Sequence, residues 1–320
     1  MRFDEAVRAA MFHEMDRDPS VFAYGEGIND PGGFFGTTAG LHLAFGERCL
    51  DVPNSEEALV GFGLGAALGG LRPIFVNLRI EFLLLAANAL VNHVAKWGDL
   101  QGRDVPVPFT IRAMVGRGWG QGAQHSGSYA SMLAHVPGLQ VAIPSGPAQA
   151  AGLLVSAVRG NRPTVLIEPK AVYDTTEELA GELAPVPIGR AVVRRAGSDL
   201  TLVAVGDAVN LALRVAGELA EVHGVEAEVI DACSLAPFDA ATIVESVTRT
   251  GRVGVVDIGW AAFGLAAEVA RGLLSAGVSL RAPMASWAPE GHAPAGCFAE
   301  ARHYPTDGGV LAGALALVRE

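Results

Sequence analysis

Short apolar, β-branched runs alternate with longer stretches of helical periodicity along nearly the whole chain. Strands that alternate with helices in this way are typical of parallel α/β units, in which each helix carries the chain back to the start of the next strand. In the first half of the chain the pattern predicts strands at Val21–Tyr24, Ile74–Leu78, Phe109–Arg112, Leu139–Ile143 and Val165–Glu168, and helices at Phe3–Met15, Glu56–Gly70, Phe82–Trp97 and Ala148–Arg159.

The same alternation resumes after Pro169–Arg190, a segment rich in Glu and Pro that is typical of a linker. A length of 320 residues also fits two domains. We therefore predict two consecutive parallel-sheet domains, residues 1–175 and 191–320, joined by a linker at 176–190. In the second domain we predict strands at Leu200–Val205, Ala227–Asp231, Val253–Asp257 and Val278–Ala282, and helices at Ala208–Val222, Ala240–Thr248, Gly264–Leu274 and Gly309–Leu317.

Composition excludes several classes of function. The chain has 23 basic and 34 acidic residues and no basic run, which argues against nucleic-acid binding. Its apolar stretches are too short or too interrupted to cross a membrane, and MRFDEAVRAAMFHEM is typical of an amphipathic helix rather than a signal peptide. Cys49, Cys233 and Cys297 are odd in number and lack metal-ligand spacing, so we expect reduced cysteines in a cytoplasmic protein.

The stretch from Gly118 to Val158 contains no Asp, Glu, Lys or Arg. Its several Pro and Gly residues exclude a single membrane helix. Because a solvent-facing surface needs charged side chains, we expect this stretch to be buried on several sides. A large subunit interface would bury it.

The segment Asp51–Gly70, DVPNSEEALVGFGLGAALGG, places a carboxylate at the start of a predicted helix. Ser55 or Asn54 can cap this helix, and Glu56 then falls in its first turn. Gly61, Gly65 and Gly69 repeat along one face, which allows another backbone to approach closely. Glu56 is a candidate site residue, although the helix macrodipole alone would also favour a carboxylate here. Its neighbour Glu57 is the expected surface residue.

The glycine-rich stretch Arg117–Ser128 contains His125, whose imidazole suits proton transfer near neutral pH. The alternative is a histidine that closes a hydrogen bond within the loop. Ser126 lacks a nucleophile elbow, which argues against a hydrolase. The Gly-Asp pair in Val205–Asn210 lacks the later Asn of a thiamine diphosphate and Mg²⁺ motif, so the chain has no diphosphate–metal clamp of its own.

Taken in order, several segments resemble the β subunit of the decarboxylating first component of 2-oxoacid dehydrogenase complexes, which are transketolase-like thiamine diphosphate enzymes. The resemblance covers almost the whole chain and is far more specific than any single motif. It is carried by YGEGINDPGGFFGTTAGL (24–41), DVPNSEEALVGFGLGAALGGLRP (51–73), LVNHVAKW (90–97), QHS (124–126), HVPGLQVAIPS (135–145), PTVLIEPK (163–170), VIDACSLAPFD (229–239) and HYPTDGGVLAGAL (303–315).

The resemblance implies a transketolase-like pyrimidine-binding domain, a transketolase C-terminal-like domain and an α2β2 heterotetramer. In such an assembly the α-type subunit holds the diphosphate and Mg²⁺, and the β subunit holds the aminopyrimidine ring. By resemblance, Glu56 matches the acid that hydrogen-bonds the pyrimidine nitrogen, and Phe82 matches an aromatic residue beside that ring. His125 matches a loop histidine that acts on the substrate or acyl intermediate, and Glu26 matches an acid near the cofactor and the subunit interface.

Some relatives also bind a structural potassium ion through carbonyl groups at a helix end, which corresponds here to Val158, Gly160 and Asn161. Apart from the resemblance, Phe82 has the spacing of an ordinary core residue. The chain departs from the family pattern at Gly127, where QHSQ is usual, and at Asn88, where Asp is common. Further departures are Gln149 and Ala151 at a helix start, Cys233 in place of an Arg, and the unusual segment Pro283–Cys297.

Three functions follow from these observations. In the first, the chain is a β subunit of an enzyme that decarboxylates a 2-oxo acid and passes the acyl unit to a lipoyl carrier, with a lipoyl acyltransferase or an acyl carrier protein as partner. In the second, the same type of subunit transfers a two-carbon acyl or ketol unit to a non-lipoyl acceptor in a biosynthetic pathway. In the third, the chain is a non-catalytic scaffolding subunit.

Overall fold

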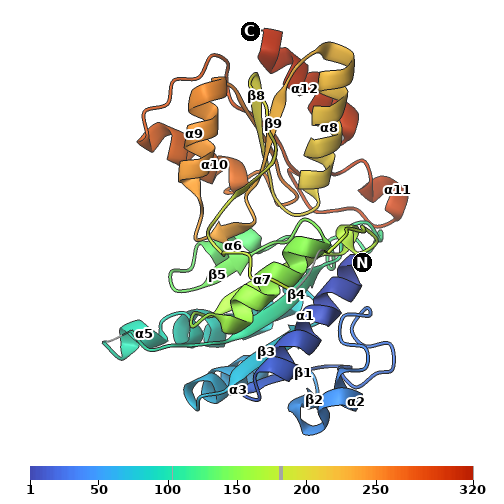
Figure 1. Ribbon diagram of the computed structural model, residues 1–320, viewed down its shortest axis with the longest axis vertical. Helices are drawn as coiled ribbons and strands as arrows, with labels where there is room; N and C mark the ends of the chain where they lie inside the picture. Colours follow the sequence, from blue (N-terminus) through green and yellow to red (C-terminus); the bar gives the residue numbers. More distant parts are fainter. Residues whose placement is uncertain (103, 180–182, 320) are drawn as a thin grey trace. The chain divides into compact units, whose positions relative to one another are not determined.

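The computed structural model describes residues 1–102, 104–179 and 183–319, which fold into two compact units (Figure 1). The first unit contains Met1–Gly116 and Met132–Ile188, and the second contains Arg117–Ser131 and Gly189–Glu320. The loop that carries His125 therefore lies within the first half of the sequence but belongs to the second unit.

The first unit is built on a parallel sheet, as the alternating pattern predicted. Its strands lie in the order β5-β6-β4-β3-β1-β2, and each of these neighbouring pairs runs parallel. Most of their side chains are buried, which is typical of parallel strands covered on both faces. The strands are β1 (Val21–Gly25), β2 (Cys49–Asp51), β3 (Arg72–Asn77), β4 (Thr110–Val115), β5 (Gln140–Ala142) and β6 (Thr164–Pro169).

Helices cover this sheet, and α1 lies beside α7 (Figure 1). Gly152 allows close packing on α7, because a Cβ there would lie 2.4 Å from a methyl of Val186, whose N–H donates to the Gly152 carbonyl. Part of the charge-free stretch is thus buried by its own chain. The α-helices are α1 (Phe3–Arg17), α2 (Leu41–Phe45), α3 (Glu56–Leu68), α4 (Ile80–Leu83), α5 (Trp97–Leu100), α6 (Ala130–Ala134) and α7 (Pro147–Arg159), with 3₁₀ turns at Gly46–Arg48, Leu84–Ala86 and Lys170–Val172.

The structure does not contain the single continuous helix predicted over Phe82–Trp97. The chain instead forms α4, the 3₁₀ turn Leu84–Ala86, a π-helical segment at Ala89–Val94 and then α5. Because π-helical turns occur mostly as local bulges and are frequent near functional sites, this segment fits its position next to α3, with which it packs.

The second unit has a mixed sheet in the order β12-β11-β8-β9-β7, in which only the β7–β9 pair is antiparallel among the described pairings. Its core consists largely of Leu, Val and Ala side chains from β8, β9 and α8. The elements are β7 (Val192–Arg195), β8 (Leu200–Ala204), β9 (Ala227–Asp231), β10 (Ser234–Ala236), β11 (Val253–Val256), β12 (Ala285–Trp287), α8 (Ala208–His223), α9 (Ala240–Thr250), α10 (Leu265–Ser275), α11 (Cys297–Glu300) and α12 (Asp307–Arg319).

One predicted strand of the second domain is wrong. Val278–Ala282 is irregular, and the strand beside β11 is formed by Ala285–Trp287 instead. This strand is anchored by Trp287, whose ring lies 2.5 Å from the position that a Cβ on Gly254 would take. Glycine at that position therefore gives the indole its space.

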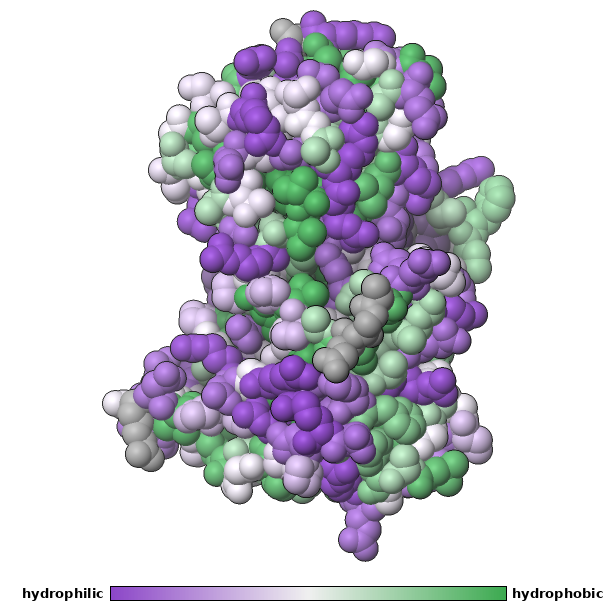
Figure 2. All heavy atoms as spheres, viewed as in Figure 1, coloured by the Kyte–Doolittle hydropathy of each residue, from purple (hydrophilic) through white to green (hydrophobic). Residues whose placement is uncertain are grey.

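Hydrophobic and hydrophilic side chains are interspersed on the face shown in Figure 2. Within the described part of the chain, no helix combines the length and the apolar character needed to cross a membrane. Several large apolar side chains are nevertheless exposed, and Phe263 and Phe298 of the second unit are the most exposed aromatics among them.

Candidate active site

The first sheet contains a topological switch point between β1 and β3. The chain leaves β1 toward β2 on one side, whereas it leaves β3 toward β4 on the other side. In open parallel sheets the two diverging connections leave a crevice beyond the carboxyl ends of such strands, and ligands bind there.

A small hollow lies at this point. It combines two carboxylates and two amides with apolar and aromatic surfaces, and it unites three of the predicted site residues: Glu26, Glu56 and Phe82. The described residues that line it are Glu26, Asn54, Glu56, Leu59, Phe75, Val76, Asn77, Leu78 and Phe82.

Glu56 is the first residue of α3 and is partly buried. The helix is held against β1 because the Tyr24 hydroxyl donates a hydrogen bond of 2.8 Å to the Leu59 carbonyl. Gly63 permits this close contact, since a Cβ there would lie 2.3 Å from both the Tyr24 hydroxyl and the Phe109 ring. The predicted side-chain cap is wrong for Ser55, which occupies the N-cap position without a capping hydrogen bond from its side chain.

The glycine stripe predicted on α3 does not pack within this chain. Apart from the adjacent residues and the backbone of α3 itself, no described atom lies within 4 Å of the Cβ positions of Gly61 and Gly65. Phe62 and Leu68 on the same helix are also partly exposed, at 47% and 38%. The face of α3 that the stripe forms is thus available to another chain.

Glu26 follows directly on β1, so its position depends on how closely β1 approaches β3. Gly25 allows that approach, because a Cβ there would lie only 2.3 Å from the Val76 carbonyl oxygen. The turn after Glu26 is held by Asp51, whose carboxylate accepts a hydrogen bond of 2.9 Å from the Gly27 N–H.

Asn77 was missed by the sequence reasoning. It is the last residue of β3, is buried, and donates a hydrogen bond of 2.5 Å to the Arg79 carbonyl, just before Phe82 on α4. A polar residue at the carboxyl end of a buried strand was the available signal. The predicted strand extended one residue farther, to Leu78, so that Asn77 was placed inside it.

Glu57 is exposed and is not among the residues that line the hollow, as expected for a surface neighbour of Glu56. Its carboxylate accepts a hydrogen bond of 2.8 Å from the Asn88 amide. Asn88 in turn accepts from Asn92, and Asn92 accepts from Lys96, so that an exposed row of polar side chains follows the π-helical segment. Asn88, one of the departures from the family pattern, thus forms part of this row.

His125 is partly buried and lies in the second unit, in the glycine-rich loop 117–131, whose last two residues begin α6. Its backbone N–H donates to the Gly122 carbonyl at 3.2 Å. The next residue, Ser126, is tied to the second unit through its carbonyl, which accepts a hydrogen bond of 3.1 Å from the Tyr304 hydroxyl. His125 is therefore carried by a different unit from Glu26, Glu56 and Phe82.

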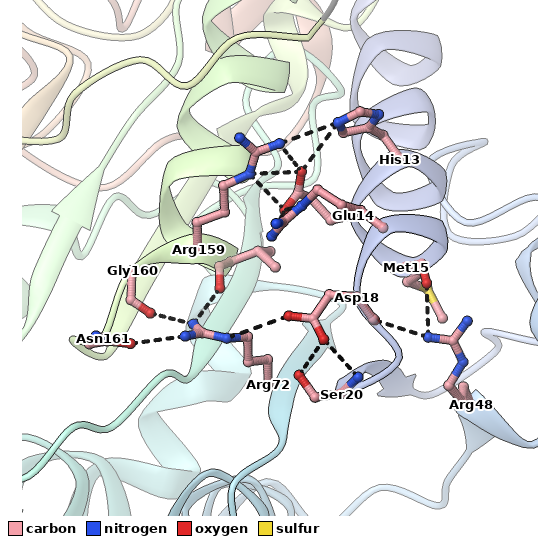
Figure 3. Close-up of polar contacts among 12 residues, drawn as sticks. His13, Glu14, Met15, Asp18, Ser20, Arg48, Arg72, Arg159, Gly160 and Asn161 are labelled. Atoms are coloured by element: carbon pink, nitrogen blue, oxygen red, sulfur yellow. Dashed lines mark hydrogen bonds and ion pairs between the residues drawn. The ribbon is translucent and has the colours of Figure 1, made fainter.

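The carbonyl groups suggested for potassium accept hydrogen bonds from an arginine (Figure 3). Arg72 Nη1 donates to the carbonyls of Val158 and Gly160 at 2.9 and 2.7 Å, and Arg72 Nη2 donates to Asn161 Oδ1 at 3.0 Å. A neighbouring arginine, Arg159, binds the buried carboxylate of Glu14. A guanidinium thus hydrogen-bonds all three groups that the resemblance assigns to potassium.

The side chains that line the hollow have the chemistry to suit one part of a thiamine cofactor, its aminopyrimidine ring. A carboxylate beside aromatic and aliphatic surfaces suits a flat heteroaromatic ring with a polar edge, and no described residue that lines the hollow is basic. Across the described ranges, no group of three or more His, Cys, Asp and Glu side chains is arranged to hold a metal ion.

Comparison with known proteins identifies the family. Residues 1–175 match the transketolase pyrimidine-binding domain, and residues 189–291 match the transketolase C-terminal domain. The chain is 38% identical over 295 residues to the β subunit of acetoin:2,6-dichlorophenolindophenol oxidoreductase from Cupriavidus necator, with 87% of each chain covered. The chain belongs to the family of 2-oxoacid dehydrogenase first-component β subunits.

Other members of this family are similarly related. The chain is 38% identical over 258 residues to the β subunit of 2-oxoisovalerate dehydrogenase from Bacillus subtilis, covering 80% of this chain and 79% of that one. It is also 38% identical over 274 residues to the β subunit of the mitochondrial pyruvate dehydrogenase first component from Drosophila melanogaster, covering 84% and 75%. The predicted family is confirmed, and the family depends on thiamine diphosphate.

A solved structure supports the fold. A split-gene transketolase, in an inactive β4 tetramer, superposes with a TM-score of 0.82 at 24% sequence identity, covering 100% of this chain and 99% of that chain. The predicted α/β fold with two transketolase-like domains is therefore confirmed.

Proposed function

We propose that this chain is the β subunit of a heteromeric thiamine diphosphate-dependent enzyme that decarboxylates a 2-oxo acid and transfers the acyl unit to a lipoyl carrier. The observation that carries the proposal is the hollow at the β1–β3 switch point, which brings together Glu26, Glu56 and Phe82 in a chain of this family. The apolar part of the lining and the carboxylate of Glu56 at the start of α3 match the needs of the pyrimidine ring.

Thiamine diphosphate, when bound, would supply the carbanion and the electron sink that decarboxylation of a 2-oxo acid requires. Glu56 would accept a hydrogen bond from the pyrimidine nitrogen and so hold a proton at that atom. Phe82 would supply an apolar face for the ring, and Glu26 would add negative charge at the end of β1. His125 would hold or move a proton on the substrate or the acyl unit.

We propose that an α-type partner binds the diphosphate and Mg²⁺ in an α2β2 assembly. This part of the proposal is supported by the lining of the hollow, which suits a ring but offers no basic side chain to a diphosphate among its described residues. The open glycine face of α3 supports it as well, because Gly61 and Gly65 leave room for a second backbone right beside the helix that carries Glu56.

The experiment is CO₂ release from a panel of 2-oxo acids by this chain assembled with its α-type partner, thiamine diphosphate and Mg²⁺. Glu56→Gln should lower kcat by about 10²- to 10⁴-fold, the usual contribution of a positioned acid–base group. Glu57→Gln is the matched control, because this exposed neighbour has the same size and charge and should leave kcat unchanged. Equal rates for wild type and Glu56→Gln would refute the role of Glu56.

The acceptor is tested separately. Acylation of a lipoyl domain by the assembled enzyme, measured as an increase in the mass of that domain by mass spectrometry, would support the dehydrogenase function. CO₂ release without lipoyl acylation, but with transfer to an added aldehyde or ketone, would favour the two-carbon acyl or ketol transferase. Assembly without CO₂ release from any 2-oxo acid would favour the scaffolding subunit and would overturn the proposal.

A further inference from the structure

The loop 117–131 has an anchor in the second unit that the proposed mechanism does not use. Residues 118–131 contain no charged side chain and several glycines, so the loop has few groups of its own that could fix its conformation. Glycine also loses more backbone freedom on ordering than any other residue. A loop of this composition needs external contacts to hold one shape.

Glu300, at the end of α11, supplies such contacts. Its side chain is buried, with the residue only 1% exposed, and one carboxylate oxygen accepts a hydrogen bond of 2.9 Å from the Gly118 N–H. The other oxygen accepts a hydrogen bond from the Gly120 N–H. Hydrogen bonds from backbone N–H groups to a carboxylate are charge-assisted and stronger than those between neutral groups.

The two glycines are required by this arrangement. Gly118 and Gly120 have φ values of +94° and +66°, which L side chains rarely adopt. A Cβ on Gly120 would also lie 2.3 Å from the Cys297 backbone nitrogen. The loop and the segment before α11 are further joined by a hydrogen bond of 2.7 Å from the Gly296 N–H to the Gly120 carbonyl.

The second half of the loop is held by Tyr304. Besides its hydrogen bond to the Ser126 carbonyl, its ring lies beneath the guanidinium of Arg117, at 4.1 Å from Cζ to the ring centroid. Arg117 in turn forms an ion pair with Asp207, whose pKa is raised by burial and lowered in part by this arginine. Contacts on both sides of His125 therefore come from the same C-terminal segment.

We propose that Glu300 is a positioning residue that holds the His125 loop in the conformation needed for proton transfer to the substrate or acyl unit. This inference rests on the proposed function, because it assigns to Glu300 an effect that acts through His125. The buried carboxylate has two acceptor oxygens for two loop N–H groups, and only a carboxylate can accept at both.

The anchoring is tested by hydrogen exchange of the assembled protein, which needs no substrate. Glu300→Gln replaces one acceptor oxygen with an NH₂ group, so amides of Gly118–Gly122 should exchange at least about tenfold faster. Glu290→Gln, at an exposed residue of the same segment, is the matched control and should leave this exchange unchanged. Unchanged exchange in Glu300→Gln would overturn the anchoring. Tyr304→Phe keeps the ring under Arg117 and should accelerate exchange near Ser126, which provides a second, milder variant.

The catalytic consequence is tested by a double-mutant cycle on kcat/KM for acyl transfer, with thiamine diphosphate affinity measured in parallel. Glu300→Gln should lower kcat/KM by about 10- to 100-fold, as small misplacements of catalytic groups do, and should leave cofactor affinity unchanged. In the His125→Gln background the same change should have no further effect. Two results would overturn the positioning role and leave the proposed function intact. One is that the losses in kcat/KM from Glu300→Gln and His125→Gln multiply in the double variant, and the other is that Glu300→Gln keeps full activity while His125→Gln is impaired. Full activity of His125→Gln would instead refute the role that the proposed function gives to His125.

Discussion

The buried ion pair between β4 and β6 allows a quantitative test of what holds the first unit together. Arg112 is fully buried and Glu168 is 1% exposed. Arg112 Nε donates to Glu168 Oε1 at 2.5 Å, and its Nη2 donates to Glu168 Oε2 at 2.9 Å. The Tyr173 hydroxyl donates to Glu168 Oε2 at 2.8 Å and stays protonated, because burial raises its pKa well above the ordinary value.

Arg112→Met should strongly destabilise the first unit. The substitution leaves the Glu168 carboxylate buried with only the Tyr173 hydroxyl among the partners described above. Breaking a buried ion pair in this way costs about 3–5 kcal/mol in the free energy of unfolding. Since 1 kcal/mol shifts the melting temperature of a unit of this size by about 2–4 °C, the expected loss is about 6–20 °C.

The double variant Arg112→Met/Glu168→Gln separates the charge from the packing. It removes both charges and keeps an acceptor for Tyr173, so its melting temperature should recover most of the loss. Melting is followed by circular dichroism and calorimetry on the chain and on the assembled protein. Arg271→Met, which removes an exposed ion pair with Glu268, is the control and should leave the melting temperature unchanged.

Two results would refute this reasoning. A loss of less than 2 °C in the melting temperature of Arg112→Met corresponds to a cost below roughly 1 kcal/mol in the free energy of unfolding. It would mean that water or another group compensates the Glu168 carboxylate. A double variant that melts well below the single variant would mean that packing around the two side chains, rather than the unpaired charge, dominates the cost.

Three further predictions concern packing, pH and thiol reactivity. Gly63→Ala should destabilise the protein by about 1–3 kcal/mol in thermal melts, because its Cβ would clash with Tyr24 and Phe109. Gly61→Ala, whose Cβ meets open space, should be neutral or stabilising in the single chain. The opposite order of stabilities would refute this account of the packing. Burial raises the pKa of the Asp239 carboxyl, but hydrogen bonds from two backbone amides and a threonine hydroxyl together hold that pKa below the ordinary value for aspartate. The stabilisation from Asp239 is therefore present above the unfolded-state pKa and is lost as the pH falls through the folded-state pKa. When the free energy of unfolding is measured by urea denaturation at a series of pH values, Asp239→Asn should therefore reduce its decline at acid pH. An unchanged decline would contradict this. In native protein a thiol reagent should label Cys297 and spare Cys49, which is buried and has a pKa raised to about 11 by burial; rapid labelling of Cys49 would contradict its burial.

Strands and helices whose own residues form a clear hydrophobic pattern could be predicted from the sequence. Strands whose position depends on pairing with a neighbouring strand could not. β1, β8 and β11 are almost entirely apolar and fully buried, and the structure has them close to the predicted bounds. β7 is short, half-exposed and antiparallel, so its sequence carries no buried run. Val278–Ala282 has strand-like composition, but the chain pairs with β11 only farther on, where Trp287 finds its space over a glycine.

The same difference applies to the candidate site. The structure places Glu26, Glu56 and Phe82 around one hollow, as the resemblance implied. Asn77 was missed because its role depends on the sheet order, which places the end of β3 beside the end of β1. The potassium suggestion rested on carbonyl groups alone, and sequence could not show that Arg72, distant along the chain, bonds to them.

The placement of residues 117–131 has a consequence for how this protein can be divided or recombined. A gene fragment that ends at Ile188 would encode all of the first unit, yet it would separate the glycine-rich loop from Glu300 and Tyr304. Chimeras that exchange C-terminal halves between relatives would likewise pair one protein's loop with another protein's anchor. We therefore expect the loop and its C-terminal anchor to be inherited together, as one structural module that two separate stretches of the gene encode.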